Sequence, residues 1–156
     1  MKLPNGITGF YEKQNGPPKI DGKLFKQLCF NTIKNTGGKV LDFKEPQGGT
    51  NFFDVEVNIF NTYFHILLNA YYPFLAFASV VNFGEIKFID EPQLHKEFSP
   101  FYSVLDTKEL NGKVIIKLGS KKCIIQNEND LNSAELEQLA YWKPERIGDV
   151  IFNHWD

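Results

Sequence analysis

The chain has 156 residues, the usual size of one domain, and we expect residues 1–156 to form a single domain with its own hydrophobic core. Seventeen basic and 19 acidic residues leave a net charge of −2, which excludes a general attraction to nucleic acid or to an anionic membrane. Cys29 and Cys123 are too few for a four-cysteine zinc site, and we expect buried free thiols and no cofactor. The first residues lack the apolar run of a signal peptide, so the expected location is cytoplasmic.

The first third of the chain predicts a short strand, a helix and a second strand. A short strand is expected over 7–11, and the Asn-Gly-Pro-Pro run that ends at residue 18 is a clear break. Asp21 is a suitable N-cap for a helix over 22–35, which the following glycines end. Two faces of this helix are candidates for the core, one with Leu24, Leu28 and Ile33 and one with Phe25, Cys29 and Thr32.

Residues 53–59 alternate strictly between apolar and polar side chains, which predicts a half-buried strand. A two-residue turn at Asn61-Thr62 would join it to a second strand and give a β-hairpin. That turn pairs apolar residues on the inner face, namely Ile59 with Phe64, Val57 with Ile66, Val55 with Leu68 and Phe53 with Ala70.

The segment 63–81 is mostly apolar, but His65, Asn69 and Pro73 interrupt it, so buried strands are expected and a membrane span is not. Further strands are predicted over 72–81 and 85–89, joined by an Asn-Phe-Gly loop. A short helix or a turn is expected over 90–98. The remaining strands are expected over 101–105, 114–118 and 122–125.

The last part of the chain predicts two helices. Asn132 and Glu135 have the spacing of a capping box, which starts the first helix. Lys143-Pro144 should interrupt it and start a second helix that runs close to the C-terminus. The predicted fold is α+β, with a mostly antiparallel sheet of about five to seven strands, one face of which the 22–35 helix and the two C-terminal helices cover.

Searches for catalytic motifs leave one cluster of polar residues. Phosphate-binding glycine loops, nucleophile elbows and paired metal-binding histidines are absent from the sequence. The outer face of the predicted hairpin carries Asp54, Glu56, Asn58, His65 and Asn69. Three interpretations stay open: a solvated sheet face, a general base or metal patch that uses Asp54, Glu56 and His65, and a surface that docks a protein.

Aromatic residues suggest where a partner would bind. Tyr63 lies on the same face of the hairpin, amid charged side chains, as interface anchors often do. The tail ends in His154, Trp155 and Asp156, which we expect either to pack as a lid on the core or to form a partner-binding edge.

The ending Tyr-Trp-Lys-Pro-x-x-x-Gly-x-x-x-Phe-Asn-x-Trp-Asp, residues 141–156, resembles that of a group of uncharacterised proteins of Bacillus-type bacteria, and residues 3–10 are similar to their starts. Small acidic proteins of such bacteria often look like immunity proteins, which neutralise a toxin. The expected function is therefore a non-enzymatic protein-binding module, in its specific form an immunity-like inhibitor of a bacterial toxin. The alternatives are a small hydrolase or metal-dependent enzyme, and a structural component of a larger complex.

Overall fold

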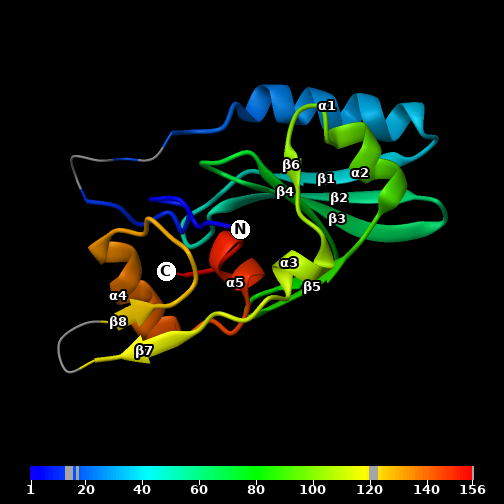
Figure 1. Cartoon of the computed structure of the whole chain (residues 1–156). Helices are drawn as coiled ribbons and strands as arrows, with labels where there is room; N and C mark the ends of the chain where they lie inside the picture. Colours follow the sequence, from blue (N-terminus) through cyan, green and yellow to red (C-terminus); the bar gives the residue numbers. More distant parts are fainter. Residues whose placement is uncertain (13–15, 17, 120–122, 156) are drawn as a thin grey trace.

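The computed structural model describes residues 1–12, 16, 18–119 and 123–155. The fold is α+β, as predicted, with helices on both sides of a mostly antiparallel sheet (Figure 1). The elements in chain order are α1 (Gly22–Asn35), β1 (Lys39–Lys44), β2 (Phe52–Ile59), β3 (Thr62–Asn69), β4 (Phe74–Asn82), β5 (Glu85–Ile89), α2 (Pro92–Phe98), β6 (Ser103–Val104), α3 (Thr107–Leu110), β7 (Ile116–Leu118), β8 (Cys123–Ile125), α4 (Ser133–Trp142) and α5 (Ile147–Ile151).

The main sheet is a meander in which each strand pairs with the next one along the chain. Its order is β1-β2-β3-β4-β5, all antiparallel, and the short β6 adds a parallel pairing at the start of β4. The predicted hairpin near residue 119 forms a separate two-stranded sheet from β7 and β8, and its turn residues 120–122 lie outside the described part of the chain. No helix in the described residues is both long enough and apolar enough to cross a membrane.

The β2–β3 hairpin forms, but its turn lies one residue earlier than predicted. Phe60 and Asn61 make the turn, with φ angles of 54° and 58°, instead of Asn61 and Thr62. Positive φ at both central residues gives a two-residue turn whose twist matches that of the strands. Each cross-strand pair therefore shifts by two residues, so that Val57 lies opposite Phe64. A shift of two leaves every side chain on its predicted face.

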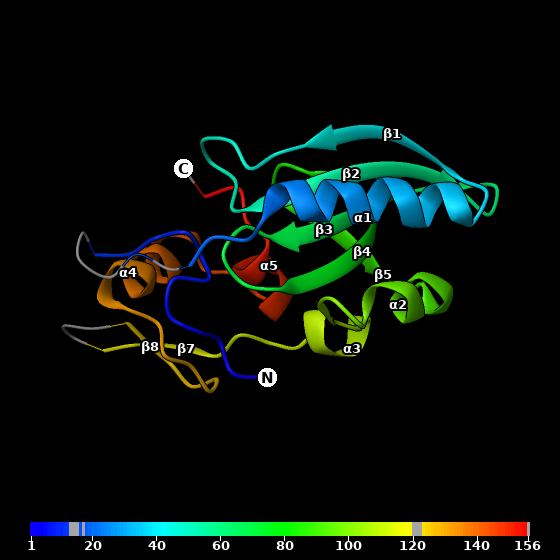
Figure 2. The same ribbon diagram turned by 90° about the horizontal axis from the view of Figure 1, so that it is seen from above.

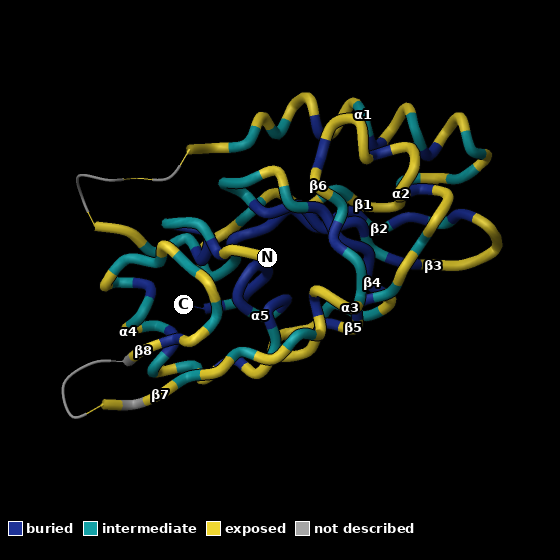
Figure 3. Tube along the Cα trace, viewed as in Figure 1, coloured by how far each residue is buried: buried dark blue, intermediate teal, exposed yellow. Residues whose placement is uncertain are grey.

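Both faces of the sheet are covered, which corrects the prediction that the 22–35 helix and the two C-terminal helices cover the same face. On one side, Phe25, Cys29 and Ile33 of α1 pack against alternate residues of β2 and β3 and against α2. On the other side, α5 and the residues after it pack against the remaining alternate residues, Phe52 and Leu67 among them. Figures 2 and 3 show α1 and α5 on opposite sides of the buried strands. The sheet is the middle layer of three.

Cys29 is a buried free thiol, as predicted, and burial in this apolar layer raises its pKa. The side chain of Cys123 is outside the described residues.

Local helix signals are confirmed where the sequence is most explicit. The Asp21 side chain accepts hydrogen bonds from the backbone N–H groups of Lys23 and Leu24 at the start of α1. The capping box at the start of α4 is complete, because Asn132 accepts from the Glu135 N–H and Glu135 accepts from the Asn132 N–H. These interactions satisfy backbone donors that have no partner in a first helical turn.

The predicted strand over 7–11 is wrong. Residues 5–8 form a turn whose donors point at the buried carboxylate of Glu135. Gly6 N–H donates to Oε1 at 2.6 Å, while the Thr8 N–H and hydroxyl donate to Oε2 at 3.0 and 2.6 Å. The Glu135 carboxylate, 127 residues from Thr8, thus replaces the inter-strand hydrogen bonds that a strand would have formed. These contacts attach the N-terminal segment to α4.

The second C-terminal helix is shorter than predicted. Lys143 ends α4 with a left-handed conformation, φ 50°, and α5 begins only at Ile147 and ends at Ile151. Pro144 is therefore part of the connection and does not open α5. Residues 152–155, which we call the strap, form neither helix nor strand, and Phe152 and Trp155 pack into the core on this side of the sheet. The predicted lid is therefore an irregular segment and not a helix.

Candidate functional site

A cleft of about 410 Å³ lies between the β4–β5 turn and the C-terminal part of the chain. We call it the aromatic cleft. Its size falls within the range of pockets that hold small ligands or single side chains. One wall comes from the turn, and the other comes from the α4–α5 connection and the strap. The lining residues are Phe83, Gly84, Glu85, Ile86, Trp142, Lys143, Pro144, Glu145, Asp149, Phe152, Asn153, His154 and Trp155.

Aromatic rings from four segments of the chain lie in or next to this cleft. Trp142 at the end of α4 and Trp155 in the strap lie parallel, with centroids 6.4 Å apart and planes 3° apart. The ring of His154 lies 5.2 Å from Phe52, edge to face, and 5.8 Å from Phe83. The other rings are buried or partly buried, whereas Phe83 is 75% exposed at the tip of the hairpin turn. An exposed phenylalanine beside packed aromatic rings is a feature of binding surfaces.

His154 is half-buried between these rings, and its environment favours the neutral imidazole. Burial lowers its pKa below the ordinary value, and the Asp54 carboxylate opposes this shift only in part. The side chain therefore lines the cleft mainly as an uncharged aromatic group near neutral pH.

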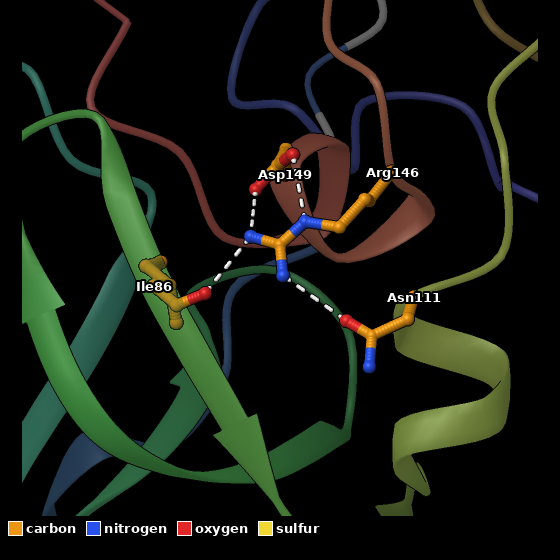
Figure 4. A network of polar contacts seen from close by, with 4 residues as sticks. All are labelled: Ile86, Asn111, Arg146 and Asp149. Carbon is orange, nitrogen blue, oxygen red and sulfur yellow. Dashed lines mark hydrogen bonds and ion pairs between the residues drawn. The ribbon is translucent and has the colours of Figure 1, made fainter.

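Arg146 holds the α4–α5 connection against the sheet and against α3 (Figure 4). Its guanidinium donates to both carboxylate oxygens of Asp149, at 2.8 and 3.2 Å, and to the backbone carbonyl of Ile86 in β5, at 2.8 Å. A further bond of 3.0 Å reaches the Asn111 side chain, and the guanidinium carbon lies 5.2 Å from the centre of the Phe88 ring. Four hydrogen bonds and the Phe88 ring engage this cation, so Arg146 fixes the wall of the cleft.

Three buried asparagines hold the strap in place. The side-chain amides of Asn51 and Asn69 both donate to the carbonyls of Ile7 and Ile151, at 2.8 to 3.0 Å. Asn153 donates to the Thr8 carbonyl and accepts from the Trp155 N–H. The prediction of Asn69 as a solvated binding residue is therefore wrong, since its side chain is fully buried and satisfies backbone groups that the irregular segments leave unpaired.

The Asp54, Glu56 and His65 cluster is only partly assembled. Asp54 Oδ1 lies 2.7 Å from His65 Nδ1, a diagonal contact between neighbouring strands. Glu56 lies opposite His65 in the ladder, but its carboxylate is 4.0 Å from the Lys44 amine. Asp54 also lines a second hollow of about 340 Å³, which shares Phe83 and His154 with the aromatic cleft. No set of three His, Cys, Asp or Glu side chains in the described residues is placed to hold a metal ion.

The remaining predicted binding residues are scattered. His154 and Trp155 line the aromatic cleft. Asn58 and Tyr63 are cross-strand partners next to the β2–β3 turn, where Tyr63 is 71% exposed, and neither lines the aromatic cleft. Asp156 lies outside the described residues.

Sequence reasoning missed Phe83, Trp142 and the two glutamates of the cleft, Glu85 and Glu145. One signal could have identified the first of these. A phenylalanine in an Asn-Phe-Gly hairpin loop has no strand face to bury it, so its exposure could have been expected. The others come together only through contacts between residues about 60 positions apart.

Comparisons with known proteins add no relatives: no family model, curated protein or solved structure matches this chain.

Proposed function

We propose that the protein is a non-enzymatic protein-binding module whose aromatic cleft holds a side chain from the surface of a partner. The observation that carries this proposal is the position of Phe83, which is 75% exposed at the mouth of a cleft lined by both tryptophans of the chain. Exposed aromatic side chains next to a preformed hollow are typical of the few residues that dominate binding energy.

The construction of the cleft supports the same function. The asparagine cluster and the Arg146 network hold the segments that form its walls, so the cleft is formed before a partner arrives. A preformed site loses less side-chain and backbone entropy on association, which favours affinity.

The experiment compares capture of a partner by three versions of the chain. Wild type, Phe83→Ala and the matched control Phe101→Ala are used as baits in a lysate of the native cells. Phe101 is also an exposed phenylalanine, 55% accessible, but it lies outside the cleft. The retained protein is then purified and its dissociation constant measured by calorimetry.

We expect Phe101→Ala to bind like wild type and Phe83→Ala to bind about 30-fold more weakly, as truncation of a binding hot spot does. Equal binding by the two variants would contradict the assignment of the cleft, and the absence of any protein that binds in purified form would contradict the function.

A toxin is the partner that the resemblance implies, and inhibition of that toxin is the specific form of the proposal. The test is growth of a bacterium that produces the captured partner. Wild type should restore growth when it is produced together with the partner, whereas Phe83→Ala should not. A partner that does not impair growth would limit the function to binding.

A second candidate function rests on the 2.7 Å contact between Asp54 and His65. A carboxylate on one ring nitrogen can orient a histidine that acts as a general base toward water at the other nitrogen. The pair is mostly covered, however, with side-chain accessibilities of 12% and 15%. Ester and phosphoester substrates would test it: an activity that His65→Gln abolishes and Glu56→Gln keeps would favour an enzyme, and no turnover by wild type would argue against one.

A further inference from the structure

The chemistry of the aromatic cleft indicates which kind of side chain it accepts, an inference that rests on the proposed function. The rings that line it are those of Phe83, Trp142, Phe152 and Trp155, together with the mainly neutral His154. Phe152 and Trp155 are buried, so Phe83 and the partly exposed Trp142 offer the accessible ring faces. The face of an aromatic ring carries a negative quadrupole and attracts cations, most strongly when the ring belongs to tryptophan.

Residues with carboxylate side chains line the same cleft. Glu85 and Glu145 are exposed at the two walls and form no ion pair within the described part of the chain. Asp149 also lines the cleft, but its carboxylate is neutralised by Arg146. Lys143 is the one cation among the lining residues, so two free carboxylates and one amine leave a net charge of −1.

We propose that the aromatic cleft binds an arginine side chain of the partner protein. A guanidinium is flat, so it can stack on a tryptophan or phenylalanine ring while its N–H groups donate to a carboxylate in bidentate fashion. The cleft provides both surfaces within one hollow of about 410 Å³. An anionic side chain would meet the two free carboxylates, and a purely apolar one would leave them without a partner.

Tryptophan fluorescence provides a direct readout, because the two tryptophans of the chain, Trp142 and Trp155, both line the cleft. The probe is Nα-acetyl-arginine methylamide. Its control is the citrulline analogue, which has nearly the same shape without the charge. Both are titrated into the full chain at constant ionic strength.

We expect a saturable change in fluorescence with the arginine probe and a dissociation constant for the citrulline probe roughly five- to thirty-fold weaker, which is the size of a cation–π contact with a supporting carboxylate. The double substitution Glu85→Gln, Glu145→Gln should reduce this preference several-fold, because only the cation–π contact with the rings then distinguishes the two probes. Glu137→Gln, an exposed change on α4 outside the cleft, should leave it intact. Added salt should weaken binding of the arginine probe and leave the citrulline probe unaffected.

Equal affinity for the two probes, or a linear change without saturation, would overturn the arginine assignment. The binding function would still stand if the partner were lost on Phe83→Ala in the capture experiment, so the two failures are distinguishable. All three glutamate substitutions change exposed side chains, so the variants retain the fold, and unchanged thermal unfolding verifies this.

Discussion

Replacement of Glu135 by glutamine tests whether one buried carboxylate anchors the N-terminal segment to the rest of the fold. Its two oxygens accept hydrogen bonds from Gly6, from Thr8 and from the cap residue Asn132. The glutamine side chain of the Glu135→Gln variant would keep the shape and one acceptor oxygen, but its NH₂ group would face donors at the position of the other oxygen.

The cost follows from these contacts. With the amide nitrogen at the Oε2 position, the Thr8 hydroxyl can rotate and accept, but the Thr8 N–H loses its acceptor. An unsatisfied buried donor costs about 1–3 kcal/mol, and the remaining bonds lose the extra strength that a charged acceptor gives, about 1 kcal/mol each. Relief of the desolvation cost of a buried charge offsets part of this. The net loss of unfolding free energy is about 2–4 kcal/mol, or about 5–15 °C in Tm for a chain of this size.

Thermal unfolding followed by circular dichroism measures the shift. Glu137→Gln is the matched control because Glu137 is exposed on the same helix and its side chain forms no hydrogen bond or ion pair with the described residues. We expect its Tm to stay within about 1–2 °C of wild type. If both variants unfold at the same temperature, the Glu135 carboxylate is not the anchor and the reasoning is refuted.

Three further predictions concern the two cores and the strap. The Tyr102 hydroxyl is buried without a hydrogen-bond partner in the described residues, and burial raises its pKa to about 12. Tyr102→Phe should therefore leave the urea midpoint unchanged or raise the free energy of unfolding by about 1 kcal/mol. A clear loss of stability would show that the hydroxyl has a partner. A Cβ at Gly148 would lie 2.3 Å from the Phe88 ring, so Gly148→Ala should lower the free energy of unfolding by about 1–3 kcal/mol. In the control Gly48→Ala the Cβ meets open space, and the free energy of unfolding should hardly change. Equal effects of the two substitutions would argue against this packing. Burial lowers the pKa of His154 in the folded state, so its contribution to the free energy of unfolding is complete above the unfolded pKa of about 6.5 and is lost as pH falls through the lowered, folded-state pKa. Urea unfolding measured over this pH range should show a smaller loss of stability for His154→Gln than for wild type. Identical pH profiles for the two proteins would contradict the burial of this ring.

Prediction succeeded where the deciding interaction is local. The caps at Asp21 and Asn132 involve donors two or three residues away, so the residue types alone indicate where α1 and α4 begin. The alternation over 53–59 predicted which side chains share a face, and that assignment held even though the turn was misplaced, because the side-chain period of a strand is two.

Prediction failed for which segments pack on each face of the sheet. The alternating polar residues suggested a wet outer face, yet Phe52, Leu67 and Asn69 on that face lie under the strap. Periodicity reports which residues lie together on one side of a strand, but it does not report what packs there. That depends on the path of the chain about a hundred residues later.

By itself, the sequence determined the type and approximate limits of most helices and strands, since these depend on contacts within one helical turn or between adjacent strands. Only the tertiary structure decided which polar residues are structural and which line a cleft. Asn51 meets the Ile151 carbonyl across 100 positions, and Phe83 meets the strap across about 70, and no spacing rule connects residues so far apart. The physical reason is that a buried polar group must form hydrogen bonds with whatever partners the folded backbone places near it. Its role is therefore decided only when both hydrophobic cores have formed.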